Sequence, residues 1–167
     1  MSVSVSYASE ADSVTLHDLF ASVVAPLEIY NNAARSTELA KYTAEHFRLL
    51  MRADRLSVVI AYLNGRPSGF AITEDEHGPI WIEWYGVAEE ARGHGIGEQL
   101  IRFVLTEARR RNATRVWCDT RTDNLASNAL YQKLGFRKLC ELPNHWHGQD
   151  FFLWEFSPLH LAEAVGS

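Results

Sequence analysis

Three glycines within five residues form a candidate anion-binding turn near the middle of the chain. They are Gly93, Gly95 and Gly97, and they lie between a segment with strand character and a segment with helix character. The first amides of a helix have no acceptor within the helix, and the helix dipole also attracts anions. Glycine lets the backbone approach a phosphate closely, and the preceding Arg92 can add a charge-assisted hydrogen bond. We therefore interpret this turn as a candidate phosphate- or pyrophosphate-binding site.

Two common nucleotide-binding motifs do not fit this turn. A P-loop requires Lys and then Ser or Thr after its last glycine, whereas Gly97 is followed by Glu98 and Gln99. A dinucleotide fingerprint requires glycine at its first, third and sixth positions, and the sixth position counted from Gly93 is Glu98. The remaining pattern, Arg-x-x-Gly-x-Gly, favours a pyrophosphate cradle. A tight glycine turn without a ligand is the alternative.

A second group of polar side chains follows further along the chain. Asn124, Asn128 and Tyr131 are spaced four and three residues apart, so on a helix they lie on one face. Leu130 and Leu134 lie on another side of that helix, where they can pack in the core. A face with two amides and a phenol offers hydrogen bonds to a ligand. A solvated helix face is the alternative interpretation.

The elements that must position these residues follow from the hydrophobic pattern. The predicted strands cover residues 3–7, 56–63, 67–73, 79–87, 114–120, 136–142 and 151–156. The predicted helices cover residues 12–24, 36–50, 95–111 and 124–134. The succession of strand 79–87, helix 95–111 and strand 114–120 predicts a parallel strand pair with a right-handed crossover.

Together these segments resemble the GNAT superfamily of acyl-CoA-dependent N-acyltransferases. The resemblance covers residues 80 to about 156 and is carried by Arg92-Gly-His-Gly95-Ile-Gly97 and by Asn124…Asn128…Tyr131…Gly135-Phe136. It implies a single domain over residues 1–167 with an α+β fold. The expected architecture is a mixed, mostly antiparallel sheet of six to seven strands with a central parallel pair, flanked by about four helices.

The resemblance also implies acetyl-CoA as co-substrate, and the spacing of candidate ligands predicts no metal ion. In this family the glycine turn holds the pyrophosphate, the strand before it pairs with the pantetheine arm, and an amide on the later helix reaches that arm. The residues of this chain that are expected to bind the cofactor are Tyr85, Gly86, Val87, Arg92, Gly93, His94, Gly95, Ile96, Gly97, Glu98, Asn124 and Asn128. The family's tyrosine near the thioester sulfur corresponds to Tyr131, which is expected to stabilise the departing thiolate.

The expected reaction is direct attack of an amine on the thioester carbonyl of acetyl-CoA. An alkyl ammonium of pKa about 10.4 must first lose a proton, which costs roughly 4–5 kcal/mol near pH 7. One candidate base is Glu83, whose strand resembles the corresponding strand of diamine acetyltransferases. The other is Asp119, twelve residues before Tyr131, where ribosomal-protein alanine N-acetyltransferases carry a glutamate. We predict Glu83, because Arg121 is expected to pair with Asp119 and lower its pKa. A surface carboxylate is the alternative for each.

Several other reactive side chains are expected to play no part in covalent chemistry or metal binding. Cys118 points to the opposite side of its strand from Asp119 and is expected in the core, which argues against an acyl-cysteine intermediate. His145, Trp146 and His147 are predicted in a loop that borders the acceptor pocket, where they either contact substrate or cap the sheet. The two histidines lack a third metal ligand at a recognisable spacing.

Composition and net charge disfavour several classes of binding partner. The chain has 167 residues, of which 47% are hydrophobic and 22% charged, as expected for one globular domain. Its 16 Lys and Arg against 21 Asp and Glu give a net charge of −5, which disfavours nucleic-acid binding. No apolar run is long enough for a membrane span, and two cysteines make no disulfide framework. We expect a cytoplasmic protein.

The acceptor is expected to be a small-molecule amine, with polyamines favoured. A protein N-terminus or lysine is one alternative, and a non-catalytic acyl-CoA-binding module is another. Neither a nucleic acid nor a membrane is expected as a partner, and a homodimer is left open.

Overall fold

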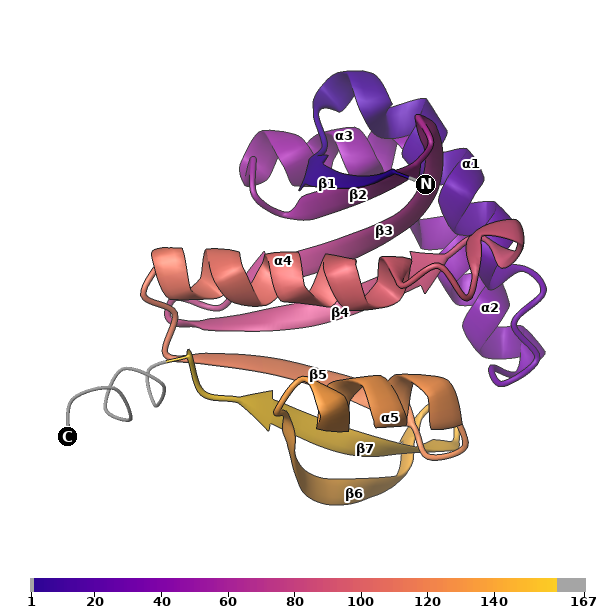
Figure 1. Cartoon of the computed structure of the whole chain (residues 1–167). Coiled ribbons are helices and arrows are strands. Elements are labelled where there is room, and N and C mark those ends of the chain that lie inside the picture. The colour runs from indigo at the N-terminus through magenta and orange to yellow at the C-terminus, as the bar shows by residue number, and fades with distance from the viewer. Residues whose placement is uncertain (1, 159–167) are drawn as a thin grey trace, which may run out of the picture. The chain divides into compact units, whose positions relative to one another are not determined.

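The computed structural model describes residues 2–158, which contain seven strands and five α-helices (Figure 1). The strands are β1 Val3–Tyr7, β2 Val58–Leu63, β3 Arg66–Asp75, β4 Pro79–Val87, β5 Arg115–Arg121, β6 Arg137–Trp146 and β7 Gln149–Phe156. The helices are α1 Ser13–Val24, α2 Asn32–Lys41, α3 Ala44–Ala53, α4 Ile96–Arg110 and α5 Leu125–Lys133, with short 3-10 turns at Glu10–Asp12 and Glu89–Ala91. The strands form one hydrogen-bonded sheet in the order β1-β2-β3-β4-β5-β7-β6. The predicted α+β fold is confirmed.

The sheet is mixed, as predicted. The pairs β1–β2, β2–β3, β5–β7 and β6–β7 are antiparallel. The pair β4–β5 is parallel, with its register running from Pro79 opposite Arg115 to Ile82 opposite Cys118. The chain passes from β4 to β5 through α4, which is the crossover helix that the sequence predicts.

The chain divides into two compact units. Unit 1 comprises residues 2–73 and 83–101 of the described chain, and unit 2 comprises residues 74–82 and 102–158. Within residues 2–158, every helix is too short or too polar to cross a lipid bilayer.

The core of unit 1 is an aromatic cluster centred on Phe20 of α1. The ring of Phe20 lies 4.5 Å from that of Tyr42, 5.4 Å from that of Phe70 and 5.6 Å from that of Trp84, measured between centroids. Large aromatic side chains bury much apolar area, and tilted or edge-on pairs add a favourable contact. This cluster therefore fixes α1 and the α2–α3 connection against strands β3 and β4 within unit 1.

One predicted helix is wrong. The segment 36–50 was expected as a single helix, but α2 ends at Lys41 and α3 begins at Ala44. Thr43 caps the second helix by accepting a hydrogen bond from the amide of His46 at 3.1 Å. Tyr42, which continues the apolar spacing of a helix, instead lies at the break and packs in the core. Tertiary burial of this ring and the threonine cap together override the local helical pattern.

Unit 2 places a helix on one face of its strands. Alternate residues of β5 are buried, and these are Val116, Cys118 and Thr120. On the same side of the sheet, α5 contributes Tyr131, whose ring contacts that of Trp154 on β7 at 6.3 Å. Figure 1 shows α5 (orange) lying along β5 and β7. The other face of β5 carries partly exposed residues.

The connection between the last two strands differs from the prediction. Residues 143–150 were expected to form a loop, but β6 runs to Trp146 and β7 starts at Gln149, so a hairpin joins them. The pairing of β6 with β7 shifts between Lys138 and Cys140 and again between Leu142 and Trp146. Asn144 and His147 have positive φ values of 53° and 50°. These irregularities give β6 more residues than its partner strand and re-aim the side chains near its end.

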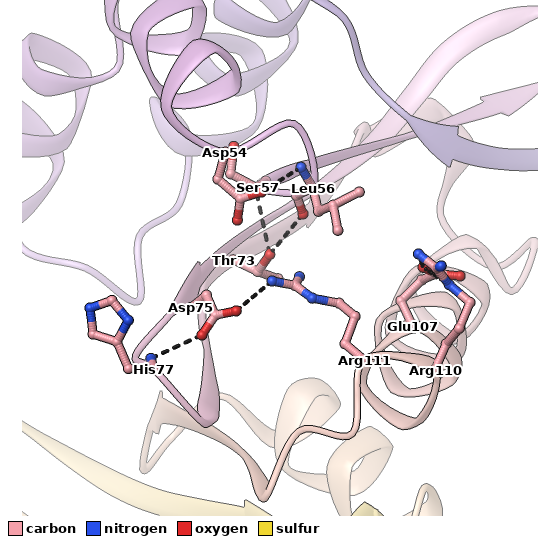
Figure 2. Close-up of polar contacts among 9 residues, drawn as sticks. All are labelled: Asp54, Leu56, Ser57, Thr73, Asp75, His77, Glu107, Arg110 and Arg111. Atoms are coloured by element: carbon pink, nitrogen blue, oxygen red, sulfur yellow. Dashed lines mark hydrogen bonds and ion pairs between the residues drawn. The ribbon is translucent and has the colours of Figure 1, made fainter.

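Figure 2 shows side-chain hydrogen bonds and an ion pair that connect neighbouring segments within each unit. In unit 1, the Thr73 hydroxyl donates to the backbone carbonyl of Leu56 at 3.3 Å. In unit 2, the Asp75 carboxylate accepts from the Arg111 guanidinium at 2.6 Å and from the amide of His77 at 2.9 Å. The second set joins the residue after α4 to the last residue of β3 and to the turn that follows it. None of the residues in these contacts is a predicted site residue.

Candidate active site

The glycine turn leads from β4 into α4 within unit 1. The amide of Ala88 donates to the carbonyl of Ser68 at 2.9 Å, and a 3-10 turn over Glu89–Ala91 follows. Gly93 and Gly95 then adopt positive φ values of 79° and 75°. A residue with a side chain is strained in this conformation, so both positions favour glycine.

The space above the turn is open. A Cβ atom added at Gly93 or at Gly95 would have no heavy atom of the described residues within 4 Å apart from the glycine and its two chain neighbours. The α4 ladder starts with the amide of Gln99 donating to the carbonyl of Gly95 at 3.1 Å, so the amides at the start of this helix precede its first bond. Such amides favour an anion. The turn therefore has the backbone geometry and the accessible space that a phosphate group requires.

The side chains of the turn divide into two kinds. Arg92 is exposed and next to the open space. His94 is directed back to the chain, with its Nδ1 atom 3.1 Å from the carbonyl oxygen of Ala91 and 3.0 Å from that of Arg92. Ile96 is buried in the core, so its backbone amide is the part that can face a ligand. Gly97 and Glu98 are partly exposed in the first turn of α4.

The strand before the turn presents two different faces in unit 1. Trp84 points to the α1–α2 side, where its Nε1–H donates to the buried Glu38 carboxylate at 2.7 Å. Gly86 points to the same side, and a Cβ atom there would approach Val23 to 2.7 Å. Glycine at this position is thus required by packing.

The opposite face of this strand carries the predicted site residues Glu83, Tyr85 and Val87, which alternate with Trp84 and Gly86. All three are partly exposed. The structure therefore places a carboxylate, a phenol and a valine along one line that leads to the glycine turn.

The two asparagines of α5 take part in the fold of unit 2. Asn124 is the N-cap, and its side-chain oxygen accepts from the amide of Ser127 at 3.2 Å. The Asn128 amide donates to the carbonyl of Thr122 at 3.1 Å, and its oxygen accepts from the Thr120 hydroxyl. Thr120 in turn accepts from the indole of Trp154 at 2.8 Å. This network ties the first turns of α5 to the end of β5.

Tyr131 lies in the interior of unit 2, whereas the sequence analysis placed the core-packing side of this helix at Leu130 and Leu134. The residue is 2% exposed, and its ring packs edge-on against Phe136 at 4.8 Å. Its hydroxyl hydrogen-bonds the Cys118 thiol, which partly offsets the rise that complete burial causes in the pKa of Cys118. The prediction that Cys118 belongs to the core is confirmed.

Asp119 lies on the other face of β5 and meets a histidine that the sequence placed in a loop. The Asp119 Oδ2 atom is 3.3 Å from Nε2 of His145, near the end of β6. The Asp119 side chain is 23% exposed and that of His145 is 43% exposed. Burial raises the pKa of the Asp119 carboxyl, and the nearby His145 opposes this rise.

The expected pairing of Asp119 with Arg121 is wrong. The Arg121 guanidinium donates to the Asp123 carboxylate at 3.0 Å and to the carbonyl of Asp150 at 3.1 Å. The pKa of Asp119 is raised and not lowered. The argument that made Asp119 the poorer base therefore does not hold.

Three contacts in these regions could not be found from spacing alone. They are Asp119 with His145, Tyr131 with Cys118, and Trp84 with Glu38. Each joins residues that are brought together by strand pairing or helix packing. Within the part of the chain that the structure describes, no group of three or more His, Cys, Asp or Glu side chains is arranged to hold a metal ion.

A mixed sheet with a parallel pair, connected through a helix that starts on an open glycine turn, defines an α+β protein with a candidate anion site at that helix. The sequence profile of the acetyltransferase (GNAT) family matches residues 24–136, and the chain belongs to this family. The recognition of the family from Arg92–Gly97 and the α5 residues is thereby confirmed.

Several proteins are similar to this chain. The ribosomal protein bS18-alanine N-acetyltransferase of Escherichia coli (strain K12) is 28% identical over 87 residues, which is 52% of this chain and 59% of that protein. The 5-NmdU N-acetyltransferase of Pseudomonas phage PaMx11 is 29% identical over 104 residues, 58% of this chain and 72% of that protein. The chain thus matches little more than half the length of the bacterial enzyme.

The solved structures agree on the fold. A putative acetyltransferase, yncA, from Salmonella typhimurium with its cofactor acetyl-CoA superposes with a TM-score of 0.78 at 18% identity, covering 95% of each chain.

Proposed function

We propose that the chain is an N-acetyltransferase that moves the acetyl group of acetyl-CoA to a primary amine by direct attack. The observation that carries the proposal is the glycine turn at the start of α4, with Gly93 and Gly95 at positive φ below open space. Membership of the GNAT family supports acetyl-CoA as the ligand of this turn.

The proposed cofactor contacts in unit 1 are mostly made by the backbone. The amides from Gly93 to Glu98 bind the pyrophosphate, Arg92 adds a charged donor, and the strand from Tyr85 to Val87 pairs with the pantetheine arm. Backbone amides of the same strand segment are the proposed donors to the tetrahedral oxyanion. In unit 2, Asn124 is the remaining proposed contact, and Asn128 is proposed to support it by tying α5 to the end of β5.

Tyr131 is proposed to stabilise the thiolate that leaves. A phenol of pKa about 10 is a weaker acid than a thiol of pKa about 8.5, so full proton transfer is uphill by about 2 kcal/mol. A hydrogen bond from the hydroxyl is therefore its first role, and proton donation is second. That this hydroxyl can interact with sulfur is supported by its hydrogen bond to the Cys118 thiol.

The acceptor is proposed to be a small amine or a polyamine. The net charge of −5 favours a cation. A protein N-terminal amine is the second candidate, supported by the similarity to the bS18-alanine N-acetyltransferase. A cytoplasmic location belongs to the same proposal.

A turnover screen tests the function. Acetyl-CoA is incubated with the chain and with separate polyamines, aminoglycosides, amino acids and N-terminal peptides, and thiol release is followed. We expect release that depends on one class of amine, with the acetylated amine found by mass spectrometry. The Gly95→Val variant serves as the control for release without a functional turn. Binding of acetyl-CoA without turnover on any amine would instead support a non-catalytic acyl-CoA-binding module.

A further inference from the structure

We propose that His145 is the general base of the reaction and that Asp119 positions it. The chemistry rests on the proposed acetyl transfer, whereas the geometry rests only on contacts within unit 2. Glu83 and Asp119 are the candidate bases predicted from the sequence, which does not decide the role of His145.

The geometry assigns different tasks to the two imidazole nitrogens. Nε2 of His145 faces the Asp119 carboxylate at 3.3 Å. When the ring is neutral, Nε2 carries the hydrogen and donates it to Asp119, so the lone pair lies on Nδ1. The imidazole ring also packs edge-on against Phe151, with centroids 5.6 Å apart. One carboxylate and one aromatic ring thus hold the histidine in a single orientation.

Asp119 and His145 differ in how far their side chains are exposed to solvent. The Asp119 side chain is largely enclosed, whereas that of His145 is 43% exposed. The accessible group is better placed to receive a proton from an incoming ammonium. The enclosed carboxylate, whose pKa burial raises, is stabilised in its charged form when the neighbouring imidazole becomes a cation. This is the division of labour between an orienting carboxylate and a histidine base.

Other charged groups near His145 have partners of their own. On β5, Arg121 binds Asp123 and the carbonyl of Asp150. On β7, the Asp150 carboxylate accepts from the amide of Asn144 at 2.8 Å.

Further along β7, the Glu155 carboxylate accepts from Trp117 at 2.9 Å and pairs with Arg115 and Arg137 at 3.2 Å. His147 follows two residues after His145, at the hairpin turn. Asp119 is the carboxylate whose contact with the imidazole carries the inference, at 3.3 Å.

The two faces of β5 carry complementary chemistry. Cys118 and the hydroxyl of Tyr131 meet on the α5 side of this strand, whereas Asp119 and His145 meet on the other side. Direct transfer needs a base where the amine enters and a hydrogen-bond donor where the thiolate leaves. Unit 2 presents these two groups on opposite sides of one strand.

The proton and bond changes balance. The ammonium gives one proton to Nδ1 of His145, from which it passes to water. The free amine then forms a bond to the carbonyl carbon, and the carbon–sulfur bond breaks. The second proton that the nitrogen loses goes to the thiolate, which Tyr131 stabilises. The products are the acetamide, coenzyme A as thiol, and one released proton.

The first test measures the imidazole tautomer and needs no activity. Long-range ¹H–¹⁵N NMR on the histidines, at a pH where the rings are neutral, should show His145 as the Nε2–H form. In Asp119→Ala we expect a mixture of tautomers, and Asp119→Asn should retain the Nε2–H form because its oxygen still accepts. A matched control is Asp18→Ala, since Asp18 pairs with the 41%-exposed His17 at 2.9 Å on α1. A tautomer mixture at His145 in the unmodified chain would overturn the pairing.

The second test measures kcat/KM against pH with an accepted amine. His145→Ala should lose about 10²–10⁴-fold near neutral pH, recover in part at high pH, and be rescued by added imidazole. Asp119→Ala should lose less, and Asp119→Asn less again. His17→Ala should behave like the unmodified chain.

A native pH profile in His145→Ala, together with a lost low-pH limb in Glu83→Gln, would assign the base to Glu83 and overturn the inference. Absence of turnover by the unmodified chain would overturn the proposed function and the base role together. The NMR result for the Asp119–His145 contact would stand independently.

Discussion

The glycine turn and helix α5 carry the two halves of the family motif, but they differ in how their polar groups are used. At the turn, Gly93 and Gly95 lie below open space, and the helix-start amides that precede the first bond of α4 are proposed to bind the ligand. On α5, the Asn128 side chain is engaged with Thr120 and Thr122, and Tyr131 is buried. A residue of the family motif can therefore serve either to bind the ligand directly or to stabilise the fold around the ligand site.

This difference gives each region its own expected response to mutation. Changes at the turn should affect cofactor affinity more than stability. Changes at Asn128 should affect stability first. Tyr131 combines a structural and a functional role, because its ring packs in the core and its hydroxyl is proposed to stabilise the leaving thiolate.

The largest effect is expected for Tyr131→Phe. The ring and its packing stay, whereas the hydroxyl is lost, so kcat should fall by about 10²–10⁴-fold with acetyl-CoA affinity nearly unchanged. Tyr42→Phe is the matched control, because Tyr42 is equally buried but lies in the aromatic cluster of unit 1. A Tyr131→Phe enzyme with native kcat, under conditions where chemistry limits turnover, would remove Tyr131 from the mechanism.

The next effect is expected at the turn. Gly95→Val adds a branched side chain at φ 75° in the open space, so calorimetry should show acetyl-CoA affinity reduced about 100-fold, or about 2.8 kcal/mol. Gly65→Val is the control, since Gly65 has φ 79° and equally open surroundings in the β2–β3 turn. Both variants should lose stability through backbone strain of about 1–2 kcal/mol. Equal acetyl-CoA affinities in the two variants would argue against the cofactor role of the turn.

A smaller effect is expected for Asn128→Ala. It removes hydrogen bonds to Thr120, Thr122 and the carbonyl of Arg121, so denaturant unfolding should show a loss of about 1–3 kcal/mol. Gln132→Ala, an exposed change on the same helix, should be nearly neutral. The comparison between turn and helix breaks down if Asn128→Ala keeps full stability and loses acetyl-CoA affinity.

The smallest effect concerns Asp119 and pH. Because its folded pKa is raised, the stability that this carboxyl contributes is present below its unfolded pKa of about 3.9 and is lost as pH rises through the folded value. Asp119→Asn should therefore gain stability relative to the unmodified chain at neutral pH. This gain should vanish in acid. A constant difference across that pH range would contradict the raised pKa.

The features that the sequence predicts well are those encoded locally. Glycine spacing after a strand predicts the turn from Arg92 to Gly97, because a positive φ and close backbone approach both select glycine. Alternation and apolar spacing predict the seven strands and most helices. The break at Tyr42 and Thr43 was missed, since an aromatic residue at helical spacing matches either a continuing helix or a buried junction.

The Asp119–His145 contact depends on long-range pairing. Its two residues are on β5 and β6, with β7 between them in the sheet. Two register shifts in β6 decide where His145 points, and no local spacing encodes them. For the same reason, an ion pair between Arg121 and Asp119 was predicted from their spacing, whereas in the folded chain Arg121 pairs with Asp123.

The proposed difference between the glycine turn and helix α5 is tested most directly by a ¹H–¹⁵N NMR titration with coenzyme A that follows both regions at once. The backbone amides of Gly93, Gly95 and Gly97 should shift in a saturable way, and a pantetheine lacking the pyrophosphate should leave them unmoved. The side-chain amide of Asn128 should keep its resonance position and its protection from exchange throughout. Unmoved turn amides at saturating coenzyme A would contradict the account.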